Sequence, residues 1–164
     1  MTDKDILLEV KGLKTHFFTD EGVVQAVNGV DFTVERGKTF CLVGESGCGK
    51  STTARSVLRL LEPTSGEVWF QGASDDGTVD KPVDVAGADR EVLRALRREL
   101  QIVFQDPFGS LSPRMSVAQI IGEGLSVHNI CPDPVERERL IIDALVEVGL
   151  DPDSRHRYPH EFSG

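Results

Sequence analysis

The feature that most constrains this chain is a glycine-rich segment between an apolar run and a helical pattern. Residues 44–51 read Gly-Glu-Ser-Gly-Cys-Gly-Lys-Ser and fit the pattern G-x-x-x-x-G-K-S/T. Residues 39–43, just before it, form a continuous apolar run that is typical of a strand buried on both faces. Residues 50–61, which follow, have the spacing of a helix. This order of strand, loop and helix predicts an α/β fold with an anion site at the start of the helix.

The residue types in the loop indicate which anion it binds. Glycines let successive backbone N–H groups converge on phosphate oxygens, where a Cβ would clash. Lys50 is placed to reach the β- and γ-phosphates, and the Ser51 hydroxyl to hold Mg²⁺. We therefore expect a nucleoside triphosphate. The glycine spacing differs from the G-x-G-x-x-G of dinucleotide-binding folds, which disfavours a nicotinamide enzyme. We interpret Cys48 as a spacer, and a redox-active thiol beside Lys50 is the alternative.

Periodicity outside the loop divides the chain into a β-rich start, an α/β centre and a helical end. Alternation of apolar and polar residues, or a short apolar run, predicts strands at 6–10, 25–34, 67–70 and 101–104. Spacing of three and four predicts helices at 90–100, 117–125 and 135–150. Residues 73–88 show no period and are expected to form an exposed insertion or a long hairpin loop. Trp69 is expected in the core of its strand.

Composition excludes several classes of protein. The formal net charge is −9 and no cluster of Lys and Arg stands out, so nucleic acid is not an expected partner. Three cysteines make an odd number without framework spacing, which argues against a disulfide-stapled secreted module. The first residues are polar, and no apolar stretch approaches the roughly 18–20 residues that span a bilayer. We therefore expect a protein that works in a reducing environment, on the cytosolic side of the membrane.

Five segments, in this order, carry a resemblance to a known family. They are 44–52 (Gly-Glu-Ser-Gly-Cys-Gly-Lys-Ser-Thr), 61–66 (Leu-Glu-Pro-Thr-Ser-Gly), 103–108 (Val-Phe-Gln-Asp-Pro-Phe), 110–115 (Ser-Leu-Ser-Pro-Arg-Met) and 158–164 (Tyr-Pro-His-Glu-Phe-Ser-Gly). Together they resemble the ATP-binding subunits of ABC transporters, in the oligopeptide/dipeptide importer group. The resemblance runs from about residue 6 to the last residue, and residues 73–88 fit it least well.

The resemblance implies a fold. It is a P-loop NTPase (RecA-like) ABC ATPase core with an N-terminal antiparallel β-subdomain and a helical subdomain, the C-terminal part being missing. Residues 1–105 would form the β-subdomain and the P-loop core, and residues 106–164 the helical subdomain that contacts the transmembrane partner. The last two residues would begin the signature motif, Phe-Ser-Gly-Gly-Gln in this group, so the motif is cut after its first glycine.

The resemblance also implies roles for particular residues. Phe17 would stack on adenine, with Phe18 as the alternative. Gln105 would approach Mg²⁺ and the attacking water, as a catalytic residue with Lys50 and a metal ligand with Ser51. Ser163 and Gly164 would bind ATP held by a second subunit. The implied nucleotide-binding residues of the loop are Gly44, Glu45, Ser46, Gly47, Cys48, Gly49, Lys50, Ser51 and Thr52.

Hydrolysis in this family needs a Walker B strand that ends in Asp-Glu, and a later switch histidine. Residues 140–143, Leu-Ile-Ile-Asp, resemble a Walker B strand, but Ala144 follows where the base should be. Ile141, Ala144, Leu145 and Val148 share one helical face, so we interpret the segment as a helix. His160 belongs to the approach to the signature motif and is not the switch histidine. The chain is therefore expected to bind Mg·ATP and to hydrolyse it negligibly.

The expected protein is the energy-coupling subunit of an importer for oligopeptides or dipeptides, peripheral on the cytoplasmic face of the membrane. Its implied partners are permease subunits, a second ABC ATPase subunit and, indirectly, a solute-binding protein. Two alternatives stay open, namely a nucleotide-binding remnant without turnover and an ABC ATPase that works on DNA or ribosomes. The segment 110–115 favours the importer over the latter.

Overall fold

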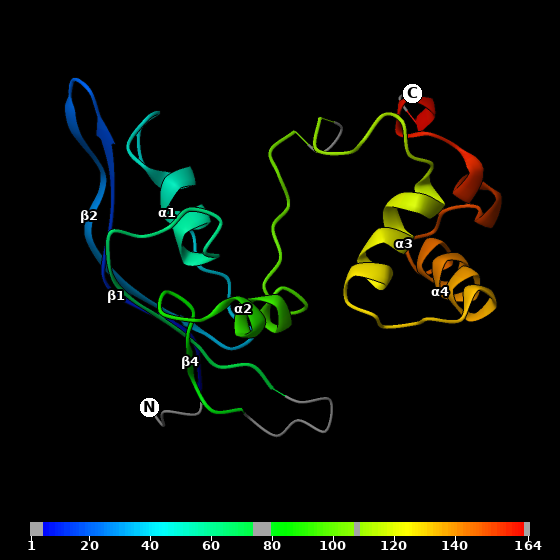
Figure 1. The fold of residues 1–164 in the computed structure, drawn as a ribbon, viewed down its shortest axis with the longest axis horizontal. Helices are drawn as coiled ribbons and strands as arrows, with labels where there is room; N and C mark the ends of the chain where they lie inside the picture. Colours follow the sequence, from blue (N-terminus) through cyan, green and yellow to red (C-terminus); the bar gives the residue numbers. More distant parts are fainter. Residues whose placement is uncertain (1–4, 74–79, 107–108, 163–164) are drawn as a thin grey trace. The chain divides into compact units, whose positions relative to one another are not determined.

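The computed structural model describes residues 5–73, 80–106 and 109–162 of the chain. The chain divides into two compact units, residues 1–100 and 101–164 (Figure 1). The first unit is a four-stranded sheet with two short helices, and the second is helical. Ser163 and Gly164, the predicted start of the signature motif, lie outside the described residues.

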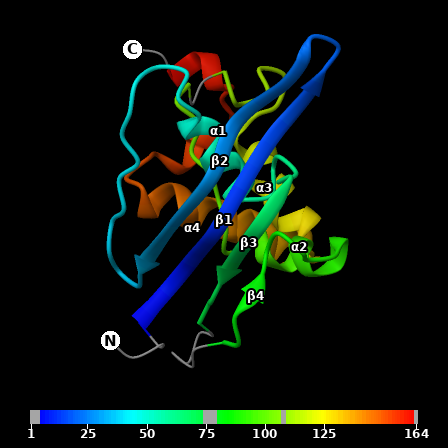
Figure 2. The same ribbon diagram turned by 90° about the vertical axis from the view of Figure 1, so that its left-hand side faces the viewer.

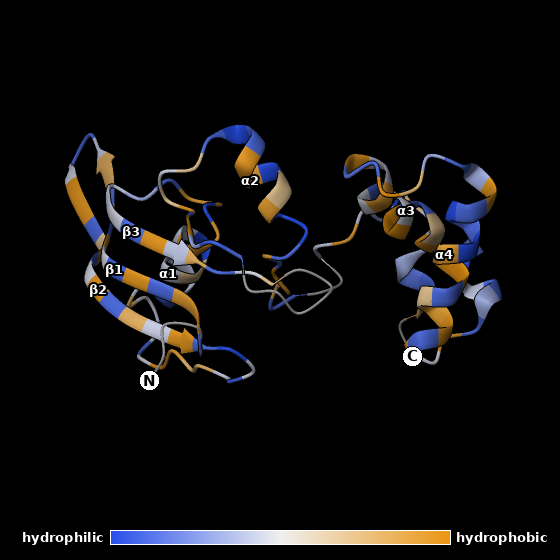
Figure 3. Cartoon of the chain, turned by 90° about the horizontal axis from the view of Figure 1, so that it is seen from below, coloured by the Kyte–Doolittle hydropathy of each residue, from blue (hydrophilic) through white to orange (hydrophobic). Residues whose placement is uncertain are grey.

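A long antiparallel hairpin forms the body of the first unit. It consists of β1 (Ile6–Thr19) and β2 (Gly22–Glu35), and the sheet has the order β2-β1-β3-β4 (Figure 2). The other strands are β3 (Ser65–Phe70), antiparallel to β1, and β4 (Val83–Asp84), antiparallel to β3. Hydrophilic and hydrophobic residues alternate along the strands (Figure 3), as a sheet with one packed face requires. The predictions of strands at 6–10, 25–34 and 67–70 are confirmed.

The core of the first unit lies where the sheet meets two helices, α1 (Lys50–Val57) and α2 (Arg90–Leu96). A buried pair of hydroxyls, Thr15 Oγ1 and Ser56 Oγ, joins β1 to α1 at 2.8 Å. Burying an aliphatic side chain stabilises a fold by about 1.5–3 kcal/mol. The buried apolar residues of this core are Val10, Leu13, Val27, Val57, Val68, Phe70, Val85 and Leu96.

Two predicted strands are not strands in the structure. Residues 39–43 and 101–104 are irregular, and none of the four described strands pairs with them. A strand is stabilised by its ladder of hydrogen bonds, so an apolar run without a neighbouring strand stays irregular. The side chains are correspondingly open to solvent, with Val43 86% and Val103 89% exposed. Phe40 finds a partner by stacking on Phe32 of β2, with ring centroids 4.8 Å apart.

Two further predictions need correction. Trp69 lies on a strand as predicted, but it is half-buried rather than in the core. Its neighbours Val68 and Phe70 take the packed face, so Trp69 lies on the other face and lines a surface pocket with Leu7 and Pro82. In the segment expected to be an exposed insertion, β4 pairs with β3 and Val85 is fully buried. Residues 74–79 of that segment lie outside the described residues.

The second unit packs α3 (Val117–Val127) against α4 (Pro134–Glu147), followed by the 3₁₀ turns η2 (Pro152–His156) and η3 (Pro159–Phe162). Helix α4 contains residues 140–143, so their interpretation as a helix is confirmed. Ile141 and Leu145 are buried as predicted. Val148 is 69% exposed, because α4 ends at Glu147 and Val148 is only its cap. Across the described residues, no helix is long and apolar enough to cross a membrane.

Candidate functional site

The glycine-rich loop leads directly into α1 in the first unit. It turns at Ser46 and Gly47, and Gly49 is the N-cap of the helix. Gly47 has φ 81° and Gly49 has φ 94°, which is the left-handed region that favours glycine. The predicted order of loop and helix is confirmed, and the two positive φ values explain why these positions are glycine.

The end of the loop lies directly against β2. A Cβ on Gly49 would stand 2.2 Å from the backbone oxygen of Ala26, far inside van der Waals contact. Thr53, one turn into α1, is buried and donates both its N–H (2.8 Å) and its hydroxyl (2.9 Å) to the Gly49 oxygen. The loop is therefore fixed to the sheet at its C-terminal end, where the helix starts.

The start of α1 differs from the starts of the other described α-helices. Side chains of Asp89, Ser116 and Asp133 accept backbone N–H groups at the starts of α2, α3 and α4. Gly49 has no side chain to do so, and no acceptor appears in the described residues for the first N–H groups of α1. The first amides of any α-helix lack partners inside the helix and carry its positive dipole end. The N–H groups of residues 50–52 are thus available to an anion.

Lys50 adds a positive charge to the same place. Its Nζ folds back over the loop and donates to the oxygens of Gly44 (2.8 Å) and Glu45 (2.6 Å), with Cys48 Sγ at 3.6 Å. This arrangement holds the ammonium at the loop, beside the uncapped amides. A cation, free N–H groups and two left-handed glycines within six residues fit the phosphates of a nucleotide.

The structure distinguishes the two phenylalanines predicted as alternatives for the adenine. Strand alternation puts Phe17 on the same face as Leu13 and Thr15, which is the face that α1 covers through the Thr15–Ser56 hydroxyl pair. Phe17 is 39% exposed, whereas Phe18, on the opposite face, is 75% exposed. The geometry favours Phe17, and its contact with adenine stays a prediction.

The other predicted site residues are not all brought together. Ser51 and Thr52 are in the first turn of α1, beside the loop. Gln105 is exposed in an irregular segment of the second unit, so its role as a Mg²⁺ ligand stays a prediction. Sequence reasoning missed the contacts that position α1, namely the approach of Gly49 to Ala26 and the hydroxyl pair. The one available indication was Thr15, a polar residue two positions after Leu13 on the apolar face.

Comparison with known proteins agrees with this geometry. Residues 27–164 match the ABC transporter family. The chain is 48% identical over 164 residues to "Oligopeptide transport ATP-binding protein OppF" of Bacillus subtilis, covering 100% of this chain and 50% of the relative. It is 45% identical over 168 residues to "Probable peptide ABC transporter ATP-binding protein y4tS" of Sinorhizobium fredii, covering 98% and 44%. The chain thus spans about half the length of the curated relatives it matches.

Solved structures agree on the fold. The dimeric bacterial ABC transporter cassette MJ0796 superposes with a TM-score of 0.73 at 24% identity, over 96% of this chain and 64% of that one. The cassette cbiO1 of Clostridium perfringens, part of the transporter complex cbiONQ, gives 0.68 at 28% identity, over 97% and 56%. The expected fold, an ABC ATPase core with an antiparallel sheet and a helical part, is confirmed. The phosphate loop and the uncapped helix agree with the family match over residues 27–164, and the chain therefore belongs to the ABC transporter family.

Proposed function

We propose that this chain is the ATP-binding part of an ABC importer for oligopeptides or dipeptides. The observation that carries the proposal is the start of α1, where uncapped amides and the Lys50 ammonium lie at one loop. The printed names of the relatives, which are peptide transport ATP-binding proteins, support the peptide class of substrate. In the proposed importer, other subunits would select the substrate.

In the proposed complex each residue of the loop binds or orients phosphate. The amides of residues 47–52 would hold the phosphate oxygens, and Lys50 would exchange its bonds to the loop carbonyls for bonds to the β- and γ-phosphates. Ser51 and Gln105 would hold Mg²⁺, which neutralises charge on the phosphates. Phe17 would stack on adenine, and Ser163 and Gly164 would contact ATP of a second subunit.

The proposal includes partners and a location. A second ABC ATPase subunit and membrane permease subunits are the partners, with a solute-binding protein acting indirectly on the far side. The subunit would be peripheral, at the cytoplasmic face of the membrane. Residues 106–164 would form the helical subdomain that contacts the permease. Residues 140–143 form a helix rather than a Walker B strand, so they do not supply the residues that hydrolysis needs. We infer that this chain binds Mg·ATP.

The test is a titration of the chain with a fluorescent ATP analogue in the presence of Mg²⁺. Lys50→Met should lower the affinity about tenfold to a hundredfold or more, because hydrogen bonds to charged groups contribute about 1.5–3 kcal/mol each. Lys38→Met, at the exposed turn after β2, is the matched control and should bind like the unsubstituted chain. Equal affinity of the Lys50→Met variant and the unsubstituted chain would refute the assignment of the loop.

A further inference from the structure

Three helices of this chain end in the same way, and one of them ends on an unusual residue. The residue after the cap is left-handed in each case, with φ 51° at Arg59, 52° at Asn129 and 76° at Gly149. At all three ends its N–H and the next N–H turn back to carbonyls of the last turn. Glycine and asparagine are the residues that this position favours. Arginine has no such conformational advantage, so another interaction must favour Arg59 at the end of α1.

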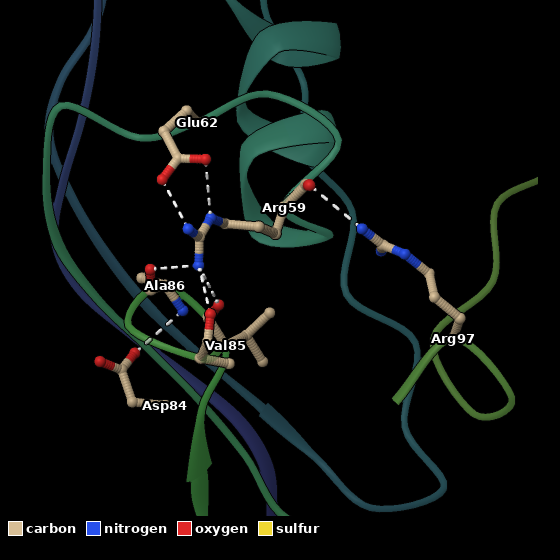
Figure 4. Close-up of polar contacts among 7 residues, drawn as sticks. Arg59, Glu62, Asp84, Val85, Ala86 and Arg97 are labelled. Carbon is tan, nitrogen blue, oxygen red and sulfur yellow. Dashed lines mark hydrogen bonds and ion pairs between the residues drawn. The ribbon is translucent and has the colours of Figure 1, made fainter. Parts of the chain in front are cut away.

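The side chain of Arg59 supplies that interaction. Its Nη1 donates to the carbonyl oxygens of Val85 (3.1 Å), Ala86 (2.6 Å) and Ala88 (3.2 Å), which follow β4 (Figure 4). Its Nε and Nη2 donate to the two carboxylate oxygens of Glu62, at 3.0 and 2.5 Å. The side chain is only 15% exposed. Three carbonyls of one turn therefore converge on a single guanidinium nitrogen.

A second arginine makes the return contact. Arg97, the C-cap of α2, donates from Nη1 to the oxygen of Leu58. Its Nη2 donates to the oxygen of Arg59 at 3.1 Å (Figure 4). These are carbonyls at the C-terminal end of α1, where the helix dipole favours a cation. The end of α1 thus reaches the 85–88 turn through Arg59, and α2 reaches the end of α1 through Arg97.

We propose that Arg59 and Arg97 form a reciprocal clasp that holds the 85–88 turn and α2 on the helix that begins at the phosphate loop. Helix α1 begins after its N-cap Gly49 and ends at the clasp. Phosphate binding at the start of α1 would thereby restrain residues 85–97. Both arginines act as positioning residues, and the inference rests on the proposed nucleotide function.

Two substitutions open the clasp from opposite sides. Arg59→Gly removes the guanidinium and at the same time installs the residue that the left-handed position favours, so the end of α1 is preserved. Arg97→Gln removes the contact to the α1 carbonyls. Arg90→Gln, an exposed arginine in the first turn of α2, is the matched control because it makes the same change of charge on the same helix.

The measurement is backbone amide hydrogen exchange of the full chain, with and without saturating Mg·ATP. In the unsubstituted chain and in Arg90→Gln, Mg·ATP should slow exchange in residues 44–53 and also in residues 85–97. In Arg59→Gly and Arg97→Gln, the slowing at 44–53 should persist while the slowing at 85–97 is lost. A purely structural role would instead change exchange at 85–97 equally with and without Mg·ATP, and leave its response to Mg·ATP intact.

The outcomes separate the two proposals. The clasp is overturned if Mg·ATP slows amide exchange at 44–53 but never at 85–97, or if both clasp variants retain the response at 85–97. Either result leaves the proposed function standing. No slowing at 44–53 in the unsubstituted chain overturns the proposed function, and the clasp as a coupling device is rejected with it.

Discussion

Substituting Gly49 by alanine tests how the phosphate loop is fixed to the sheet. The new Cβ would stand 2.2 Å from the Ala26 oxygen, so α1 or β2 must shift by about 1 Å to reach ordinary packing contact. Alanine at φ 94° also takes the left-handed penalty. That penalty is about 1–2 kcal/mol, and overpacking against a backbone adds about 1–3 kcal/mol. We expect Gly49→Ala to lower the free energy of unfolding by about 2–5 kcal/mol.

Substitutions at two other glycines of the same loop separate the steric clash from the left-handed penalty. A Cβ on Gly47, at φ 81°, has nothing within 4 Å, so Gly47→Ala should cost only the left-handed penalty, about 1–2 kcal/mol. A Cβ on Gly44 would meet the Sγ of Cys48 at 2.7 Å, and that side chain can turn away. Gly44→Ala should therefore change the stability least of the three.

The assay is urea denaturation followed by the fluorescence of Trp69, the single tryptophan, which lies on β3 of the same unit. The free energy of unfolding in water is obtained by linear extrapolation of the transition to zero urea. Equal losses for Gly49→Ala and Gly47→Ala would refute the close approach of the loop to Ala26. A fall in nucleotide affinity without any loss of stability in Gly49→Ala would contradict it too.

Three further predictions concern other parts of the fold. Thr15→Val leaves the Ser56 hydroxyl buried without its partner and should lower the free energy of unfolding, measured by urea denaturation, by about 1–3 kcal/mol. Thr15→Val combined with Ser56→Ala should lower it by less than the sum of the two single variants, and additive losses would contradict the hydroxyl pair. Burial raises the pKa of the Cys131 thiol, so maleimide should label the exposed Cys41 and Cys48 well before Cys131 at pH 7. Cys131 lies just before α4, so equal labelling rates for all three thiols would argue against the packing of α4. The hydrogen bond from Arg59 lowers the pKa of Glu62, so the stabilising contribution of this carboxylate is present above the ordinary carboxyl pKa and is lost as the pH falls through the lowered value. Glu62→Gln should therefore melt at a lower temperature than the unsubstituted chain at pH 7, with a smaller difference in strong acid. A difference that is independent of pH would contradict the ion pair.

Periodicity predicted the parts of this fold whose stability is decided locally. Alternation predicted strands within β1 and β2, and the shared apolar face of Ile141 and Leu145 predicted α4. The phosphate loop follows from glycine positions that the structure explains by positive φ. Such features depend on neighbours in sequence, which a pattern contains.

The failures concern features that depend on distant neighbours. Residues 39–43 have the composition of a buried strand, but a strand exists only beside another, and none of the described strands pairs with this run. The clasp is equally invisible in the sequence, because Arg59 occupies a position where glycine is the expected residue. Neither arginine carries a spacing that distinguishes it from Arg55 or Arg90.

The central claim is that the start of α1 and its loop bind the phosphates of a nucleotide. Titration of ¹⁵N-labelled chain with Mg·ATP, followed by backbone amide chemical shifts, tests it most directly. The account predicts that the largest shifts fall on residues 47–52, which comprise the end of the loop and the uncapped first turn of the helix, and that Lys50→Met greatly reduces them. Saturating Mg·ATP without shifts at 47–52, or with its largest shifts on α3 and α4, would contradict the account.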